Sequence, residues 1–209
     1  VGSEMCIRDS LEIDPRKLRT ELEAGLPQVA TAMVSSKMVL AGTDTNCAGG
    51  VLDDAWISCE ESSEPGHGYA FVTRPEWNEL STPEPIFHWG RFHREAVARD
   101  PSTGTIYMTE DRSNGCFYRF IPEDRDRPFG PGTLQALCIE GVPTTHPYTP
   151  ESTQPQWPNG QRWKTTWIAI PDPQASEQTC REQGIQRGAT TFMRSEGIFP
   201  DQDGIWFIA

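Results

Sequence analysis

The stretch NCAGG at residues 46–50 places a cysteine, which can bind a transition metal, directly before two glycines that favour a turn. After it come Asp53 and Asp54, a turn-forming pair, and then the apolar run WIS at 56–58, which has the composition of a β-strand. The stretch therefore combines a candidate metal ligand, a turn and a strand. The fold class follows from finding this combination more than once.

The same combination recurs at Glu95 and at Glu196. Each glutamate precedes a turn containing Asp and Gly and then an aromatic run, IYM at 106–108 or IWF at 205–207. The copies are spaced by roughly one or two multiples of fifty residues, a period typical of β-propellers, in which repeated sheets surround a central channel. Equivalent positions of successive blades meet at that channel. We therefore predict an all-β fold, a β-propeller, in which Cys47 and the two glutamates converge from inner strands of different blades.

The composition suits such a fold. The 209 residues are enough for one large core or, at the observed period, about four blades. Hydrophobic residues make up 36%, and the 18 glycines and 18 prolines favour many turns over long helices. The one helix-like stretch covers residues 15–32, with leucines at helical spacing. Strands are expected at residues 55–59, 69–72, 105–109, 116–121, 133–140 and 167–170.

The net charge of −12 argues against a nucleic-acid partner, because phosphate backbones are bound by Lys and Arg. The acidity is compatible with metal cations, for which carboxylates are natural ligands, and equally with a surface that merely keeps the protein soluble. The sequence has no apolar run of the length that crosses a membrane, about 18 residues or more, so we expect no membrane span.

The two ends of the chain have unusual features. Residues 1–10 (VGSEMCIRDS) resemble translated sequencing-adapter sequence, and we leave them out of the expected fold. Residues 204–209 end inside an expected strand. We therefore expect a fragment in which residues 11–209 form part of a propeller domain and in which sheet edges are exposed.

Five cysteines follow residues 1–10, and none forms a CxxC pair, so neither a zinc ribbon nor a thioredoxin motif is expected. The odd number leaves at least one thiol unpaired. Cys47, beside two glycines, is the candidate metal ligand. Cys116, Cys138 and Cys180 are interpreted as small buried hydrophobes.

Seven collinear segments carry a family resemblance. They are NCAGG (46–50), WISCEE (56–61), GHGY (66–69), GRFHREAVARDPSTGTIYMTED (90–111), FYRFIP (117–122), GTLQAL (132–137) and RGATTFMRSEG (187–197). In these segments the chain resembles the PhoX-type alkaline phosphatases. The resemblance implies a propeller of about six blades, of which about four would be present here. It also implies a central channel that holds iron (Fe3+) and calcium, hydrolysis of small phosphate monoesters, and a periplasmic or secreted location.

The resemblance also assigns roles to individual residues. It implies that Cys47 binds iron and that Glu95 and Glu196 are carboxylates of the same metal cluster. It implies that Arg194 contacts the phosphate group and acts in catalysis. Glu60, Glu61 and Asp111 are implied as further metal ligands, with calcium the favoured ion.

Elementary chemistry accounts for these residue types. Metal ions can neutralise phosphoryl oxygens and generate a nucleophile, calcium prefers several oxygen ligands, and iron accepts a thiolate beside carboxylates. A guanidinium has the donor geometry that suits phosphate. Neighbouring strand residues point to opposite faces, so at most one of Glu60 and Glu61 should face the channel. His93, two residues before Glu95 on the same strand face, is a candidate substrate-binding residue.

Plainer interpretations stay open. Solvated strand ends would account for Glu60, Glu61 and Asp111, a turn-stabilising role for His67, and an ion pair on one strand face for Arg194 and Glu196. The alternative function is a calcium-stabilised, non-catalytic propeller used for binding or scaffolding, and a calcium-dependent lactonase-type propeller is a further option. Cys47 together with the Arg194-x-Glu196 pair favours an alkaline phosphatase, although a fragment could be inactive. We also expect a monomer.

Overall fold

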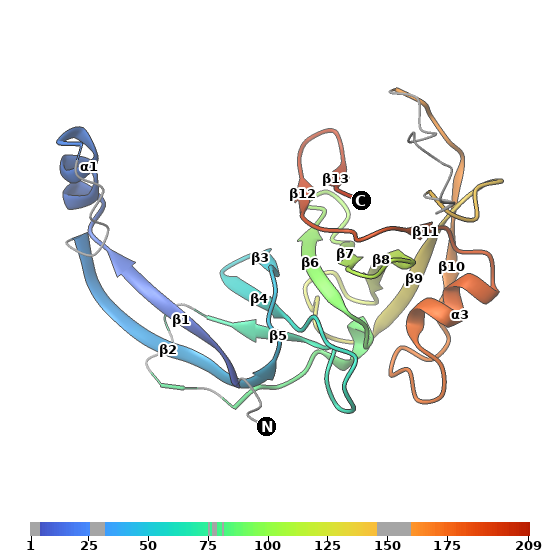
Figure 1. Ribbon diagram of the computed structural model, residues 1–209, viewed down its shortest axis with the longest axis horizontal. Helices are drawn as coiled ribbons and strands as arrows, with labels where there is room; N and C mark the ends of the chain where they lie inside the picture. The colour runs from blue at the N-terminus through green and yellow to red at the C-terminus, as the bar shows by residue number, and fades with distance from the viewer. Residues whose placement is uncertain (1–4, 26–31, 75, 77–78, 81, 146–159) are drawn as a thin grey trace.

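The structure, a computed structural model, describes residues 5–25, 32–74, 76, 79–80, 82–145 and 160–209. In this part the chain is mostly β-sheet with few helices, in agreement with the predicted all-β class. The strands form one sheet of six strands, one of three and two of two (Figure 1). None of the described helices is long and apolar enough to cross a membrane.

The largest sheet contains six antiparallel strands. They are β6 (Arg94–Arg99), β7 (Ile106–Glu110), β8 (Gly115–Pro122), β9 (Gly132–Ile139), β10 (Thr165–Ala169) and the short β11 (Thr191–Phe192). The first five follow in the order β10-β9-β8-β7-β6, and β11 pairs with β8. The four strands predicted between residues 105 and 170 are confirmed, with ends that shift by at most two residues. Turns rich in Pro, Asp and Gly separate these apolar runs, which is why the sequence alone located them.

A sheet of three strands lies beside β6 and contains β3 (Gly50–Leu52), β4 (Ala55–Cys59) and β5 (Ala70–Thr73). The loop before β3 bonds directly to β6. The Gly49 N–H donates to the carbonyl of Glu95 over 2.9 Å, and the Val97 N–H donates to the carbonyl of Gly49 over 3.1 Å. These two bonds bring the NCAGG stretch beside Glu95.

The main hydrophobic core joins the three-stranded sheet to the six-stranded one. Trp89, from the 3-10 helix η1 (Phe87–Trp89), has no exposed surface. The ring of Phe92 stacks on that of Tyr118 with centroids 4.2 Å apart. Burying a large apolar side chain contributes roughly 1.5–3 kcal/mol. The core therefore holds β6 firmly against the sheet that carries the NCAGG stretch.

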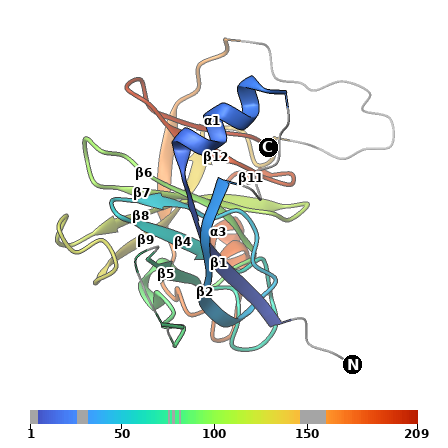
Figure 2. The same cartoon turned by 90° about the vertical axis from the view of Figure 1, so that its left-hand side faces the viewer.

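A long antiparallel hairpin of β1 (Met5–Ile13) and β2 (Met33–Asp44) carries the helix α1 (Pro15–Glu23) at its tip. Figure 1 shows the hairpin reaching away from the other sheets, and Figure 2 shows it from that side, in front of them. Residues 5–10, which were left out of the expected fold, lie in β1. The adapter origin of residues 1–10 stays a prediction.

The helix-like stretch predicted within residues 15–32 contains α1, which ends at Glu23. The side chain of Asp14 accepts hydrogen bonds from two amides of the first turn and starts the helix. Ala24 caps its C-terminal end, and Gly25 then takes φ +70°, which helical residues do not adopt. Residues 26–31 lie outside the described part of the chain.

The C-terminal part adds the helix α3 (Cys180–Gln186) and the hairpin of β12 (Ile198–Pro200) and β13 (Ile205–Phe207). Helix α3 was not among the elements predicted from the sequence. Thr179 and Glu182 form a capping box, in which each side chain bonds to the backbone amide of the other residue. This pair of residues, three positions apart, is the sequence signal that predicts the start of the helix.

The described strands do not close into a ring of sheets. Strands β6 to β9 form an antiparallel meander of the kind found in a propeller blade, whereas the neighbouring sheets are smaller. The all-β class therefore holds, and the propeller stays a prediction.

Gly50 meets the backbone of β6 so closely that a side chain has no room. A Cβ on Gly50 would lie 2.0 Å from the carbonyl oxygen of Val97. We predict that Gly50→Ala lowers the free energy of unfolding by about 1–3 kcal/mol or more, because overpacking separates the loop from β6. Urea unfolding measures this loss. Gly197→Ala is the control, since nothing lies within 4 Å of its added Cβ, and an equal loss in both variants would contradict the prediction.

Candidate active site

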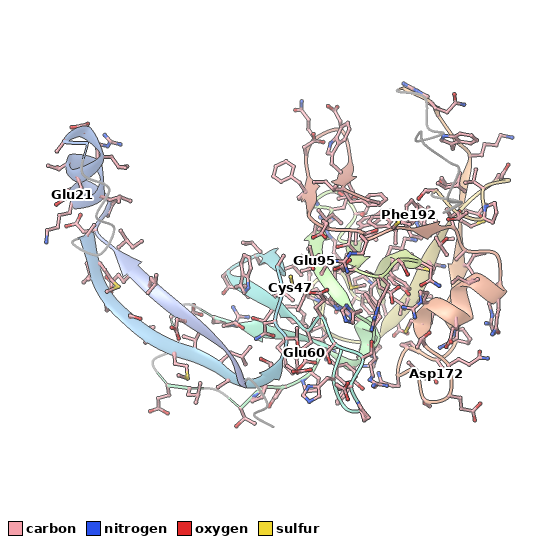
Figure 3. All side chains as sticks on the ribbon, in the orientation of Figure 1. Glu21, Cys47, Glu60, Glu95, Asp172 and Phe192 are labelled. Atoms are coloured by element: carbon pink, nitrogen blue, oxygen red, sulfur yellow. The ribbon has the colours of Figure 1, made fainter. Side chains whose placement is uncertain are left out.

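Cys47 lies in the loop between β2 and β3 rather than on an inner strand. Its N–H donates to the carbonyl of Cys59 over 3.0 Å, which ties the loop to the end of β4. Its Sγ lies 3.1 Å from Oε1 of Glu95. Figure 3 shows the two labelled residues together between the three-stranded sheet and β6. The first two predicted ligands therefore meet, although one of them comes from a loop.

Glu95 sits in an irregular part of β6. The pairing with β7 changes register beside it, and the Ala96 N–H bonds to the side-chain oxygen of Thr109 over 3.1 Å. Such irregularities re-aim side chains relative to the regular strand. Glu95 is buried, with 5% of its surface exposed.

Glu61 completes a compact group with Cys47 and Glu95, in which the ligand atoms all lie within 4.8 Å of one another. Glu61 follows β4 after one residue, and its N–H donates to the carbonyl of Thr45 over 2.9 Å. This bond holds it beside the cysteine loop. A thiol and two carboxylates at this separation offer a mixed sulfur and oxygen donor set.

Asp111 and His93 border this group. Asp111 contacts the carboxyl of Glu61, and its Oδ1 is buried without a hydrogen-bond partner in the described part of the chain. Nδ1 of His93 lies 3.3 Å from Oε1 of Glu61, and the Asp111 N–H donates to the carbonyl of His93 over 3.0 Å. Burial, followed by the positive charge of Arg112, lowers the pKa of His93. Its ring is therefore neutral at alkaline pH.

Arg194 and Glu196 lie in the loop between β11 and β12. The expectation that they share a strand face is wrong, because Arg194 has φ +57°, which extended strands do not contain. Nη1 of Arg194 pairs with Oδ2 of Asp111 over 2.9 Å. The backbone carbonyl of Glu196 accepts a hydrogen bond from Thr109 over 2.7 Å, and the carboxylate of Glu196 contributes to raising the pKa of Glu95. The loop thus brings both residues to the same site.

Glu60, which the sequence also predicted as a metal ligand, does not join the group of Cys47, Glu61 and Glu95. Its Oε1 accepts a hydrogen bond from the Asp44 N–H over 2.8 Å and lies 2.9 Å from Nδ1 of His67. Its Oε2 accepts from the N–H groups of Gly68 and Tyr69 over 2.8 and 3.1 Å. The fully buried carboxylate organises the loop after β4 and is directed away from its neighbour Glu61.

The acidic groups are held together at an electrostatic cost. Burial, followed by the contact with Glu95, raises the pKa of the Cys47 thiol to about 12. Burial, followed by the contact with Asp111, raises the pKa of Glu61 to about 7, and burial raises the pKa of Glu95. A bound cation reverses such shifts, because opposite charge favours the ionised forms. With the unpartnered, buried Oδ1 of Asp111, the group therefore fits a metal site.

Comparisons of the whole chain with known proteins indicate its family. The family model described as alkaline phosphatase PhoX matches residues 14–209. The chain belongs to the PhoX alkaline phosphatase family. Among solved structures it is similar to Pseudomonas fluorescens PhoX in complex with vanadate, a transition state analogue, with a TM-score of 0.54 and 19% identity. That match covers 82% of this chain but 40% of the other, and at this identity it concerns the fold alone. No curated protein gives a significant match.

Two arginines beside the group of Cys47, Glu61 and Glu95 were not predicted as site residues from the sequence. Arg112 follows Asp111 directly, so its position next to a predicted ligand was the available signal. Arg181, in α3, pairs with the buried Glu110 over 2.9 Å. No local pattern marks Arg181, because it lies 71 positions from its partner.

The interpretation of three other cysteines as buried hydrophobes holds for two of them. Cys116 and Cys180 are fully buried, and burial raises the pKa of both thiols, which makes them unreactive. Cys138 is a half-buried residue of β9 and therefore differs from the interpretation as a buried hydrophobe.

Adjacent glutamates allow metal binding to be separated from folding. We predict that Glu61→Gln lowers the metal content of the protein but, in chelator at about pH 5, leaves its free energy of unfolding little changed, because the carboxyl of Glu61 is then largely protonated in the unaltered protein. Glu60→Gln should instead retain metal but lose about 1–3 kcal/mol of unfolding free energy, because an amide nitrogen cannot accept the buried N–H bonds. Elemental analysis and urea unfolding measure the two effects. The same loss of metal in both variants would contradict the assignment.

The raised pKa values make the metal-free protein sensitive to pH. The pKa of Glu61 in the folded state, about 7, lies above its ordinary value of 4.5. Proton uptake therefore stabilises the folded state below the ordinary pKa, and this contribution is lost as pH rises through the folded pKa. We predict that the melting temperature in chelator falls between about pH 5 and pH 8 and falls less in Glu61→Gln. An identical fall in the variant would assign the effect to other groups.

Proposed function

We propose that this PhoX-family chain carries the site of a metal-dependent alkaline phosphatase that hydrolyses phosphate monoesters at an iron- and calcium-containing centre. The convergence of Cys47, Glu61 and Glu95, with ligand atoms within 4.8 Å of one another, is the observation that carries the proposal. The ion pair of Arg194 with Asp111 at the border of this group adds a phosphate-binding donor. The chain spans 40% of the length of the solved relative, so the activity of the whole protein is part of the proposal.

The donor types decide which ion each residue would hold. The thiolate of Cys47 suits iron, and Glu95 is the carboxylate that contacts it. Glu61, Asp111 and Glu196 offer the oxygen donors that calcium prefers. Bound metal ions would neutralise phosphoryl oxygens and lower the pKa of a bound water. Ionisation of the thiol requires such a cation, because its pKa is otherwise about 12.

Arg194 is the proposed catalytic, phosphate-binding residue. Its side chain is 60% exposed, while Asp111 is buried and holds one end of the guanidinium. In phosphoryl transfer, charge spreads over the phosphoryl oxygens in the transition state, so a fixed cationic donor there lowers the barrier. His93 is the second proposed substrate-binding residue. Its neutral ring can form a hydrogen bond with the substrate without adding charge to the site.

We also infer that strands β6 to β9 form one blade of a propeller and that the acidic group faces its central channel. The antiparallel meander and the fold-level likeness to a PhoX structure support this arrangement. The recurrence of a ligand, a turn and an aromatic strand along the chain agrees with it. A crystal structure of the full-length gene product, with its metals, tests the proposed channel.

We further propose a periplasmic or secreted monomer, on the family resemblance alone. Subcellular fractionation and size-exclusion chromatography with light scattering test the two parts of this proposal separately.

The function is tested with the full-length gene product. Hydrolysis of p-nitrophenyl phosphate at alkaline pH, together with iron and calcium in elemental analysis, is the expected result. Chelation should abolish the hydrolysis, and added metal should restore it. A protein that binds calcium and gains stability from it, but hydrolyses no phosphate ester, would favour the alternative of a non-catalytic propeller.

Cys47 provides the sharpest test of the metal. We predict that Cys47→Ala abolishes activity and lowers iron content while the fold is retained, because the thiolate binds metal rather than filling the core. Cys138→Ala, which removes another half-buried thiol, is the matched control. Normal iron and activity in Cys47→Ala would exclude the proposed role.

Arg194 and Glu196 separate phosphate binding from metal binding within one loop. We predict that Arg194→Lys impairs hydrolysis by about tenfold or more at normal metal content, because a point charge does not replace a bidentate donor. Glu196→Gln should instead lower the iron and calcium content. Steady-state kinetics and elemental analysis measure both. Unchanged kinetics in Arg194→Lys would leave the arginine as a structural partner of Asp111.

A further inference from the structure

Arg112 is a partly buried cation next to the proposed metal ligands. Its Nη2 donates to the hydroxyl of Ser63, and its Nε is buried without a hydrogen-bond partner in the described part of the chain. Among the described residues, no carboxylate lies within ion-pair distance of it. The guanidinium is thus held in place by a neutral group and retains both its charge and an unused donor.

The neighbouring arginines differ from Arg112 in this respect. Arg181 pairs with Glu110, and Arg194 pairs with Asp111, each over 2.9 Å. A guanidinium that is removed from water without a counter-charge or a full set of acceptors lowers stability, and a bound anion would offset that cost. Of Arg112, Arg181 and Arg194, Arg112 is therefore the arginine whose charge a bound anion would balance.

Arg112 lies next to Arg194, the proposed phosphate-binding residue, and this position also indicates a phosphate ligand. The Arg194 N–H donates to the carbonyl of Arg112 over 2.8 Å, so the two residues are in direct backbone contact. The preceding residue, Asp111, donates its N–H to the carbonyl of His93, and the positive charge of Arg112 acts on the ring of that histidine. Arg112 is thus adjacent to both proposed substrate-binding residues.

We propose that Arg112 is a further substrate-binding residue, which donates a hydrogen bond to a phosphoryl oxygen of the ester. This inference rests on the proposed phosphatase function. A phosphate monoester dianion has three non-bridging oxygens, and donors in addition to the metals are needed to satisfy them. Ser63 holds the guanidinium in its position, and no chemical step is assigned to Arg112 beyond this contact.

The test uses the metal-loaded, full-length protein and inorganic phosphate as the probe. Calorimetry measures phosphate binding directly, and inhibition of p-nitrophenyl phosphate hydrolysis gives a second measure. We expect Arg112→Gln to weaken phosphate binding by about tenfold or more, the loss typical of one charge-assisted hydrogen bond, and to raise KM. Metal content should stay normal. Arg112→Lys should recover part of the affinity, because it restores the charge but not the planar donor.

Arg99→Gln is the matched control, since the charge of Arg99 is already paired with that of Asp53. Phosphate binding by Arg112→Gln equal to that of the unaltered protein would overturn the proposal, as would a loss of binding that merely follows a loss of metal. Weakening confined to esters with a second anionic group would also overturn it, because the contact would then be to that group. If Arg112→Gln does not fold, Arg112→Lys decides the outcome on the same measurements.

Failure of this proposal is distinguishable from failure of the proposed function. If the unaltered protein binds phosphate and hydrolyses esters while the Arg112 variants match it, the function stands and the inference is wrong. If the unaltered, metal-loaded protein neither hydrolyses esters nor binds phosphate, both are wrong.

Discussion

The hydrogen bonds between Gly49 and β6 are the constraint on which the site depends. They join a loop of the three-stranded sheet to the edge of the six-stranded sheet, and so set Cys47 against Glu95. Backbones can approach this closely only because Gly49 and Gly50 lack side chains, since an added Cβ on either would lie 2.0 Å from a backbone oxygen. The same glycines that indicated a turn in the sequence therefore create the contact that assembles the donor set.

Several acidic side chains lie around this contact, and they differ in the groups that balance their negative charge. Glu60 and Glu110 are buried acids whose oxygens are used by backbone amides, a tyrosine or an arginine, so they stabilise local structure. Glu61 and Glu95 instead lie beside Cys47, at a place where burial raises the pKa of both carboxyls. Acids of the same type thus have opposite roles, which depend on whether neighbouring N–H groups or a cation would satisfy them.

Much of the fold was accessible from the sequence, and the errors have physical causes. Alternating apolar runs between Pro- and Gly-rich turns located most strands, because strand position is a local property. The end of α1 at Glu23 was not predicted, since leucine spacing continues past Gly25, which leaves the helix. The loop position of Arg194 was missed, because a positive φ at a non-glycine residue depends on contacts such as that of its N–H with Arg112. The alternation rule allowed at most one of Glu60 and Glu61 at the site, but it did not identify which.

The sequence by itself determined the donor types: a cysteine, several carboxylates and an arginine in segments that recur along the chain. The motifs in these segments carry the family resemblance, and the donor types indicate metal and phosphate chemistry, because the affinity of sulfur, oxygen and guanidinium groups for metals and phosphate is a property of the side chains. Only the tertiary structure decided which donors meet. Burial, backbone hydrogen bonds and register selected Glu61 over Glu60 and left Arg112 without a carboxylate partner among the described residues, and these depend on segments far apart in the chain.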